Sequence, residues 1–262
     1  MIGVYDSGIG GLSVWREIFY LLPEESYAYF SDARYCPYGE RDTDFITWRA
    51  LAISEMLIKR GCDIIAVACN TATAAAIETL RKTFDIPFIG MEPAVKPAIL
   101  ASKSGVVGVL ATAVTFKGKK YNDTRLQYAG GNPNIRIMEQ VGYGLVEAVE
   151  SGRIHSPETV ALLEKFILPM KEQGADHIVL GCTHYPFLAE EIARIAGPDV
   201  NIVNPAPAVA RQLQRNYSPK AAAAPATIEF LSSGTFNAGV RNLLDSLCAG
   251  RSYTLTEKME IK

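Results

Sequence analysis

Two cysteines, Cys69 and Cys182, hold the same place in two similar stretches of the chain, residues 61–71 and 174–184. In each stretch a glycine that can end a helix precedes a short apolar strand, and the cysteine follows that strand, before small polar residues that can begin the next helix. A thiol there lies where open α/β sheets place their ligands, and the dipole of the next helix lowers its pKa. The two stretches align without a gap: Gly61 with Gly174, Asp63 with Asp176, and Ile65 with Ile178.

Two matched thiols indicate acid–base chemistry at a carbon atom. If they face each other across a cleft, one thiolate can remove a proton from one face of the carbon while the opposed thiol returns a proton to the other face. The alternative for a single cysteine after an apolar strand is simple burial, since cysteine is among the most buried residue types. Equivalent positions in a duplicated element favour function. A redox pair would need close sulfur atoms and usually a Cys-x-x-Cys motif, which the sequence lacks.

A glycine-rich turn, residues 6–11, follows the first expected strand and supplies further candidates. It lacks the Lys-Ser/Thr of a phosphate-binding P-loop and is not G-x-G-x-x-G, so its glycines alone predict little. Asp6 and Ser7 at its start are more informative. Asp6 can bind an ammonium group or orient an acid–base group; its alternative role is a helix N-cap.

Other polar side chains close to the cysteines in sequence are also candidates. His184 comes two residues after Cys182, so it can assist the thiol or bind substrate, although a histidine that simply starts a helix is the alternative. Glu147 and Glu150 can each supply a carboxylate from a short helix, but a solvated helix face is the simpler interpretation for at least one of them. The remaining cysteines are most simply structural: Cys36, Cys62 and Cys248.

The composition excludes several classes of function. The 262 residues have a net charge of −2, with 48% hydrophobic and 21% charged residues, which is ordinary for a globular protein. There is no basic stripe with interleaved aromatics, so nucleic-acid binding has no support. No apolar run has the length of a membrane span, no signal peptide is recognisable, and five unclustered cysteines indicate free thiols in the cytoplasm. No metal-binding spacing, pyridoxal-phosphate lysine, or nicotinamide or flavin fingerprint is present, so we expect no metal and no cofactor.

Strands and helices alternate along the whole chain, which predicts α/β structure with parallel sheets. We expect residues 116–128 to form one helix, residues 218–226 to form a mobile surface loop, and the tail after Gly250 to be polar. The expected strands cover residues 2–5, 27–30, 64–68, 87–89, 106–110, 134–138, 177–181, 201–203 and 228–231.

The repeat extends beyond the cysteines. Residues 3–8 correspond in character to residues 108–113, a strand followed by a loop. We therefore predict two pseudo-symmetric parallel-sheet α/β domains facing each other across a cleft. The first covers residues 1–92 plus 205–262 and carries Cys69; the second covers residues 93–204 and carries Cys182.

Six short motifs stand in a fixed order along the chain: Asp6-Ser7-Gly8-Ile9-Gly10-Gly11-Leu12, Pro37-Tyr38-Gly39, Ala68-Cys69-Asn70-Thr71-Ala72, Glu92-Pro93-Ala94, Thr112 with Thr115, and Gly181-Cys182-Thr183-His184-Tyr185-Pro186. Taken together, they resemble those of bacterial glutamate racemase, in the aspartate/glutamate racemase superfamily. The resemblance extends from Ile2 to about residue 205. It implies a pyridoxal-independent enzyme that interconverts L- and D-glutamate and supplies D-glutamate for peptidoglycan, as a cytoplasmic homodimer.

The resemblance also implies residue roles. Cys69 would take the α-proton from D-glutamate and Cys182 from L-glutamate, with Asp6 and His184 assisting the thiols. The substrate-binding residues would be Asp6, Ser7, Tyr38, Gly39, Asn70, Thr71, Thr183 and His184.

The chain departs from the family pattern at two places. Gly118 stands where relatives often have serine, and Asn204-Pro205 stands where they often have Asp-Ser. Both departures concern a substrate or interdomain contact rather than the cysteines. Two alternatives stay open: racemisation of aspartate by the same thiols, and a small-molecule-binding or redox module in which the cysteines are incidental.

Overall fold

The computed structural model of the protein describes residues 1–219 and 225–261. The chain divides into two compact units. Unit 1 combines Met1–Met91 with Ala206–Lys262, and unit 2 is Glu92–Pro205.

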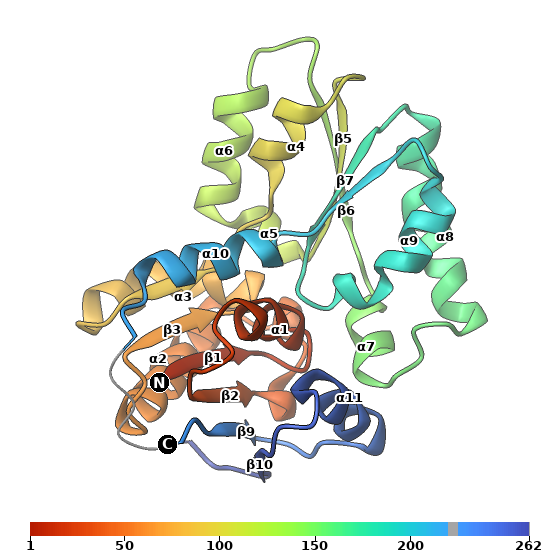
Figure 1. Ribbon diagram of the computed structural model, residues 1–262. Helices are drawn as coiled ribbons and strands as arrows, with labels where there is room; N and C mark the ends of the chain where they lie inside the picture. Colours follow the sequence, from red (N-terminus) through yellow and green to blue (C-terminus); the bar gives the residue numbers. More distant parts are fainter. Residues whose placement is uncertain (220–224, 262) are drawn as a thin grey trace. The chain divides into compact units, whose positions relative to one another are not determined.

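Unit 1 is built on a six-stranded sheet with the order β10-β9-β2-β1-β3-β4, in which every neighbouring pair is parallel (Figure 1). The central strands are buried along their whole length, as expected for a parallel sheet covered on both faces. The strands are β1 (Ile2–Asp6), β2 (Tyr27–Ser31), β3 (Ile64–Val67), β4 (Phe88–Gly90), β9 (Ile228–Ser232) and β10 (Thr254–Thr256).

The two faces of this sheet carry different side chains, because neighbouring residues of a strand point to opposite sides. Tyr27 of β2 lies on the face where the ring of Trp15 meets it edge-on at 5.7 Å. Phe30 points to the other face, into a core shared with α2 (Thr43–Lys59) and α3 (Asn70–Thr83). Trp15 belongs to α1, which packs against α10. The remaining bounds are α1 (Leu12–Leu21), α10 (Ala206–Asn216) and α11 (Ala238–Cys248).

Unit 2 has a four-stranded parallel sheet with the order β6-β5-β7-β8. Val107 and Val109 of β5 form a core with α4 and α6. Gly108 faces the other side, where a Cβ atom would lie 2.5 Å from Met170 Sδ of α8. The elements are β5 (Val106–Ala111), β6 (Arg136–Val141), β7 (His177–Gly181), β8 (Asn201–Val203), α4 (Val95–Ala101), α5 (Ala113–Lys117), α6 (Lys119–Ala129), α7 (Leu145–Glu150), α8 (Pro157–Glu172) and α9 (Ala189–Ala196).

The two sheets repeat one topology. The order β2-β1-β3-β4 in unit 1 matches the order β6-β5-β7-β8 in unit 2. The strand register matches as well, since Gly3 lies opposite Ile65 in one sheet and Gly108 lies opposite Ile178 in the other. The prediction of α/β structure with two parallel sheets is therefore confirmed, and each cysteine follows the equivalent strand of its unit.

Several expected elements differ from the structure. The single helix expected over residues 116–128 is wrong: Gly118, with ψ of 132°, is extended and separates α5 from α6. Glycine is a poor residue for a helix interior, which makes this break inexpensive. No strand is expected in the tail after Gly250, but Thr254–Thr256 forms β10 at the sheet edge. The loop expected over residues 218–226 includes positions 220–224, which lie outside the described residues.

No helix in the described part of the chain has both the length and the apolar character that a membrane span requires.

Asp176 closes the loop between α4 and β5. Its carboxylate accepts hydrogen bonds from Ser102 Oγ at 2.7 Å, Lys103 N at 2.6 Å, Ser104 N at 2.9 Å and His177 Nδ1 at 2.8 Å. Burial favours the neutral acid, but these hydrogen bonds, led by that of His177, outweigh it and lower the pKa of Asp176.

A lowered carboxyl pKa predicts acid sensitivity of folding. The stabilisation is complete above the unfolded-state pKa of about 4 and is lost as the pH falls below it towards the folded-state pKa. We expect Asp176→Asn to lower the free energy of unfolding at pH 7 and to weaken its dependence on pH between 5 and 3, measured by urea denaturation. Parallel pH profiles for the variant and the wild type would contradict this role.

Candidate active site

The candidate site residues of unit 1 lie at the carboxyl ends of three adjacent strands. The turn of residues 6–11 follows β1, the segment of residues 32–39 follows β2, and Cys69 follows β3. In a parallel sheet these ends meet at one edge, which is where such folds bind ligands.

Cys69 is the N-cap of α3. Its Sγ accepts a hydrogen bond from Ala72 N at 3.4 Å, and the thiol is 4% exposed. The free amide groups and dipole of this 14-residue helix favour negative charge on the sulfur atom. Ser7 Oγ lies 3.8 Å from Sγ, because Tyr5 and Val67 are register partners in β1 and β3. The structure therefore brings Ser7 and Cys69 together.

Asp6 turns its carboxylate onto its own loop. Oδ2 accepts a hydrogen bond from Gly11 N at 2.8 Å and a longer one from Gly8 N at 3.4 Å, and the residue is fully buried. Asp6 is not the N-cap of α1, which is Gly11; its carboxylate binds the backbone of the turn that leads into this helix. The turn leaves no room beside it: a Cβ atom on Gly11 would lie 2.6 Å from Asp6 Cβ and 2.9 Å from Tyr29 Oη.

This close approach predicts a large effect for Gly11→Ala. The added methyl group must displace Asp6 or Tyr29, so we expect turnover to fall about tenfold or more while the helical circular dichroism is retained. Gly239→Ala in α11 is the matched control, because its Cβ atom would meet only Asn237 Oδ1 at 3.3 Å. Equal activity of the two variants would show that the turn does not depend on Gly11.

Asn70, the first residue of α3, has a buried side chain without internal partners. The residue is 3% exposed, and neither Oδ1 nor Nδ2 forms a hydrogen bond within the described part of the chain. Buried amide groups are usually paired, and leaving one unpaired costs about 1–3 kcal/mol. Such a group beside a thiol is suited to binding a polar ligand. Thr71 follows it and is equally buried.

Tyr38 and Gly39 lie in a short 3₁₀ helix, η2 (Tyr38–Glu40). The hydroxyl group of Tyr38 donates a hydrogen bond of 2.5 Å to Asp32 Oδ2, and Arg49 binds the same carboxylate through Nε and Nη2, each at 2.8 Å. Burial, and then the charge of Asp32, raises the pKa of Tyr38 well above its usual value, so the phenol is a neutral donor. Sequence reasoning missed Asp32; the available signal was its position directly after β2.

In unit 2 the thiol belongs to a chain of three side chains. Cys182 Sγ lies 3.7 Å from His184 Nδ1, and His184 Nε2 lies 2.6 Å from Glu150 Oε1. A carboxylate that accepts the Nε2 proton leaves the lone pair of Nδ1 facing the thiol, where it can accept the thiol proton. Of the two candidate glutamates, Glu150 therefore joins the site; Glu147 is exposed.

The segment after Cys182 is fixed by Tyr185. Its hydroxyl group donates to Gly142 O at 3.3 Å, and a Cβ atom on Gly142 would lie 2.4 Å from that hydroxyl oxygen. Burial, followed by the charge of Cys182, raises the pKa of Tyr185 well above its usual value. Thr183 lies between Cys182 and His184 and is 2% exposed.

The expectation that both cysteines begin α-helices is wrong for Cys182. It is followed by the 3₁₀ helix η3 (Tyr185–Leu188), and α9 begins only at Ala189. The two thiols thus differ: Cys69 has a helix N-terminus, whereas Cys182 has an imidazole and a carboxylate. Burial raises the pKa of the other two buried thiols, Cys62 to about 12 and Cys248 to about 11.

Comparison with known proteins shows the family of this chain. Residues 11–213 match the family model of the Asp/Glu/hydantoin racemases. The chain is 46% identical to a glutamate racemase of Ralstonia nicotianae over 235 residues, covering 88% of this chain and 84% of that protein. It is 50% identical to a glutamate racemase of Methylococcus capsulatus over 214 residues, covering 82% and 78%.

A solved structure is similar over nearly the whole chain. The structure of Escherichia coli glutamate racemase in complex with L-glutamate and the activator UDP-MurNAc-Ala has a TM-score of 0.83 at 32% identity, covering 98% of this chain and 97% of that one. On the family model and these relatives, the chain belongs to the Asp/Glu/hydantoin racemase family.

Proposed function

We propose that this protein is a cofactor-independent glutamate racemase in which Cys69 and Cys182 are the acid–base pair. The observation that carries the proposal is the equivalent placement of two buried thiols after β3 and β7, Cys69 at a helix N-terminus that favours a thiolate and Cys182 beside an imidazole that can accept its proton. The glutamate racemases among its relatives support glutamate as the substrate.

Racemisation then needs one proton transfer on each face of the α-carbon. With L-glutamate, the Cys182 thiolate takes the α-proton, and the electron pair of the broken C–H bond is delocalised into the adjacent carboxylate. The Cys69 thiol gives its proton to the opposite face, which yields D-glutamate. The enzyme now has a Cys182 thiol and a Cys69 thiolate, the state that accepts D-glutamate in the reverse direction.

The neighbouring groups have separate tasks in this mechanism. His184, held by Glu150, accepts the proton of Cys182 and so prepares the thiolate. The helix N-terminus stabilises the thiolate of Cys69. The proposed substrate-binding residues supply amide, hydroxyl and carboxylate groups for the glutamate carboxylates and ammonium group: Asp6, Ser7, Tyr38, Gly39, Asn70, Thr71, Thr183 and His184.

Aspartate is the second candidate substrate, because the matched family model covers both aspartate and glutamate racemases. The two are separated by incubating the protein, without added cofactor, with L-glutamate or L-aspartate in deuterium oxide. We expect the α-proton NMR signal and the optical rotation of glutamate to decay together. Decay with aspartate alone would favour the second candidate, and no decay with either would refute both.

We further propose that the protein supplies D-glutamate for peptidoglycan in the cytoplasm and acts as a homodimer, as its family resemblance suggests. A bacterial strain that requires D-glutamate should grow when it expresses this chain and fail to grow with Cys69→Ala. Light scattering of the purified protein should give twice the mass of the chain; a monomer mass would refute the dimer.

A further inference from the structure

A buried ion pair lies directly behind the proposed substrate-binding Tyr38. The Arg49 guanidinium group, on α2, binds both oxygen atoms of Asp32 at 2.8 Å, and the two side chains are 2% and 0% exposed. Fork-like pairing of this kind fixes geometry as well as charge. Because Asp32 Oδ2 also accepts the hydroxyl proton of Tyr38, the position of Arg49 determines that of Tyr38.

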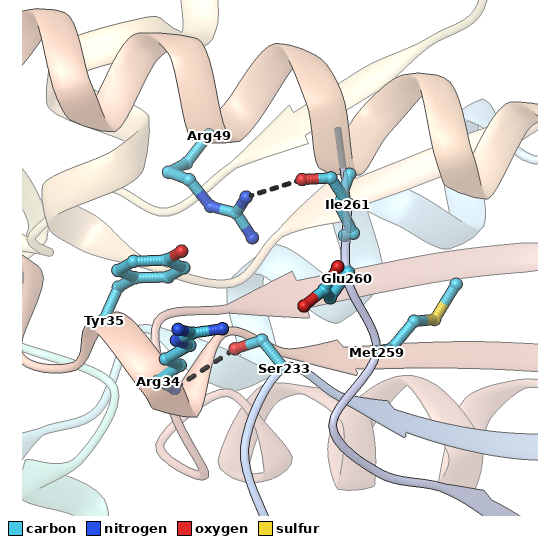
Figure 2. A pocket seen from close by; sticks show the side chains of 7 residues that line it. All are labelled: Arg34, Tyr35, Arg49, Ser233, Met259, Glu260 and Ile261. Atoms are coloured by element: carbon cyan, nitrogen blue, oxygen red, sulfur yellow. Dashed lines mark hydrogen bonds between the residues drawn. The ribbon is translucent and has the colours of Figure 1, made fainter.

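We call the segment of residues 258–261 the strap; its residues Met259, Glu260 and Ile261 line the same pocket as Arg49 (Figure 2). Lys258 N donates to Gly234 O and Met259 N to Ser232 O, both at 2.8 Å, and these bonds attach the strap to the last residue of β9 and to the turn after it. Further along, Ile261 O accepts a hydrogen bond of 3.4 Å from Arg49 Nη1. The strap thus binds the one guanidinium nitrogen that Asp32 does not use.

The surroundings of Arg49 hold it without filling the space around it. Its guanidinium carbon lies 4.7 Å from the centre of the Tyr35 ring, a cation–π contact. A cavity of about 190 Å³ remains beside it, lined by Arg34, Tyr35, Arg49, Ser233 and residues 259–261. Because packing on this side is incomplete, the orientation of Arg49 depends on its hydrogen bonds and on the ring contact.

We propose that Arg49 is a positioning residue for substrate binding, which holds Tyr38 and Gly39 in place through Asp32, and that the strap holds Arg49. This inference rests on the proposed function in assigning Tyr38 and Gly39 to the substrate. Since the thiols are untouched, the loss of this support raises KM and leaves the proton transfers themselves nearly unchanged.

Arg49→Lys tests the proposal, because lysine keeps the buried charge but cannot form the fork. We expect KM for L- and D-glutamate to rise about tenfold, the equivalent of one charge-assisted hydrogen bond, with kcat changed less than about threefold. Arg81→Lys is the matched control: Arg81 of α3 donates two hydrogen bonds to the backbone oxygen of Phe88, and its replacement should leave KM unchanged. A purely structural role for Arg49 would instead lower the thermal midpoint with KM unchanged, which would overturn the proposal.

A double-mutant cycle with Tyr38→Phe tests the route through the hydroxyl group. If Arg49 acts through that group, Arg49→Lys raises KM much less in the Tyr38→Phe background than in the wild type. An equal rise of KM in both backgrounds would show that Arg49 does not act through the hydroxyl group of Tyr38. Truncation of the chain after Lys258 should also raise KM, and this rise should be smaller in the Arg49→Lys background than in the wild type. An unchanged KM after truncation would show that the strap does not hold Arg49.

A crystal structure of Arg49→Lys gives a readout that does not depend on activity. We expect Tyr38 Oη to move beyond hydrogen-bond distance of Asp32 Oδ2, whereas an unchanged distance of 2.5 Å would contradict the positioning role. Wild-type turnover of glutamate, measured first, tests the proposed function separately.

Discussion

Cys69→Ala and Cys182→Ala should each lower racemisation of glutamate by about a thousandfold or more, since each removes one of the two groups that exchange protons with the α-carbon. Alanine leaves only a small cavity at a buried position, so we expect both variants to keep the circular dichroism spectrum of the wild type. The measurement is the initial rate of optical change with each enantiomer.

Two other cysteines provide the control. Cys62→Ala and Cys248→Ala also remove buried thiols, but burial raises the pKa of both, and neither lies at the candidate site. Any change in these variants should be in stability, with turnover per folded molecule preserved. Near-normal turnover by either site variant, or equal losses in all four variants, would contradict the two-thiol mechanism.

The single-thiol variants also test which thiol faces which enantiomer. The variant without Cys182 keeps Cys69, so any exchange of the α-proton with deuterium oxide should occur in D-glutamate. The variant without Cys69 should exchange L-glutamate. Exchange of the opposite enantiomer in either variant would reverse the assignment.

The second large effect concerns His184 and Glu150. We expect His184→Gln to lower kcat/KM about a hundredfold or more, because the thiol of Cys182 loses the base that accepts its proton. Glu150→Gln should cost about tenfold, since glutamine can still hold the imidazole but supplies no charge. Glu147→Gln is the matched control on the same helix and should behave as the wild type.

The losses of kcat/KM must be the same for L- and D-glutamate. L- and D-glutamate have equal free energies in water, so kcat/KM must fall equally in the two directions for every variant. The asymmetry between the thiols appears instead in kcat and KM taken separately, and in the isotope effect of α-deuterated substrate. In His184→Gln we expect the larger isotope effect with L-glutamate, whose proton goes to Cys182. If Glu150→Gln had the kcat/KM of the wild type, the Glu150 carboxylate would have no part in the mechanism.

The internal repeat explains how much of the fold could be predicted. Gly3 pairs with Ile65 and Gly108 with Ile178, and the sequence alignment had already placed Ile65 over Ile178. The apolar strands, the glycine turns and the positions of both cysteines after equivalent strands were readable because each depends on a few adjacent residues. The edge strand β10 was not, since three residues, Thr-Leu-Thr, carry too short a pattern.

Side-chain partners distant in sequence could not be predicted. The choice between Glu147 and Glu150 depends on the rotation of α7 about its axis, which packing decides. Asp32 and Arg49 are 17 positions apart and meet only because α2 covers the end of β2. The expectation that an α-helix begins directly after Cys182 is wrong because the 3₁₀ helix η3 precedes α9.

The deuterium content of both glutamate pools early in the wild-type reaction tests the central claim most directly. L-glutamate is incubated in deuterium oxide, and the two enantiomers are separated after a few per cent conversion. If two thiols act on opposite faces, the D-glutamate formed carries deuterium at the α-carbon, while the remaining L-glutamate stays protiated. A single base acting on both faces would return the original proton to part of the product, and D-glutamate that retains the substrate proton would contradict the account.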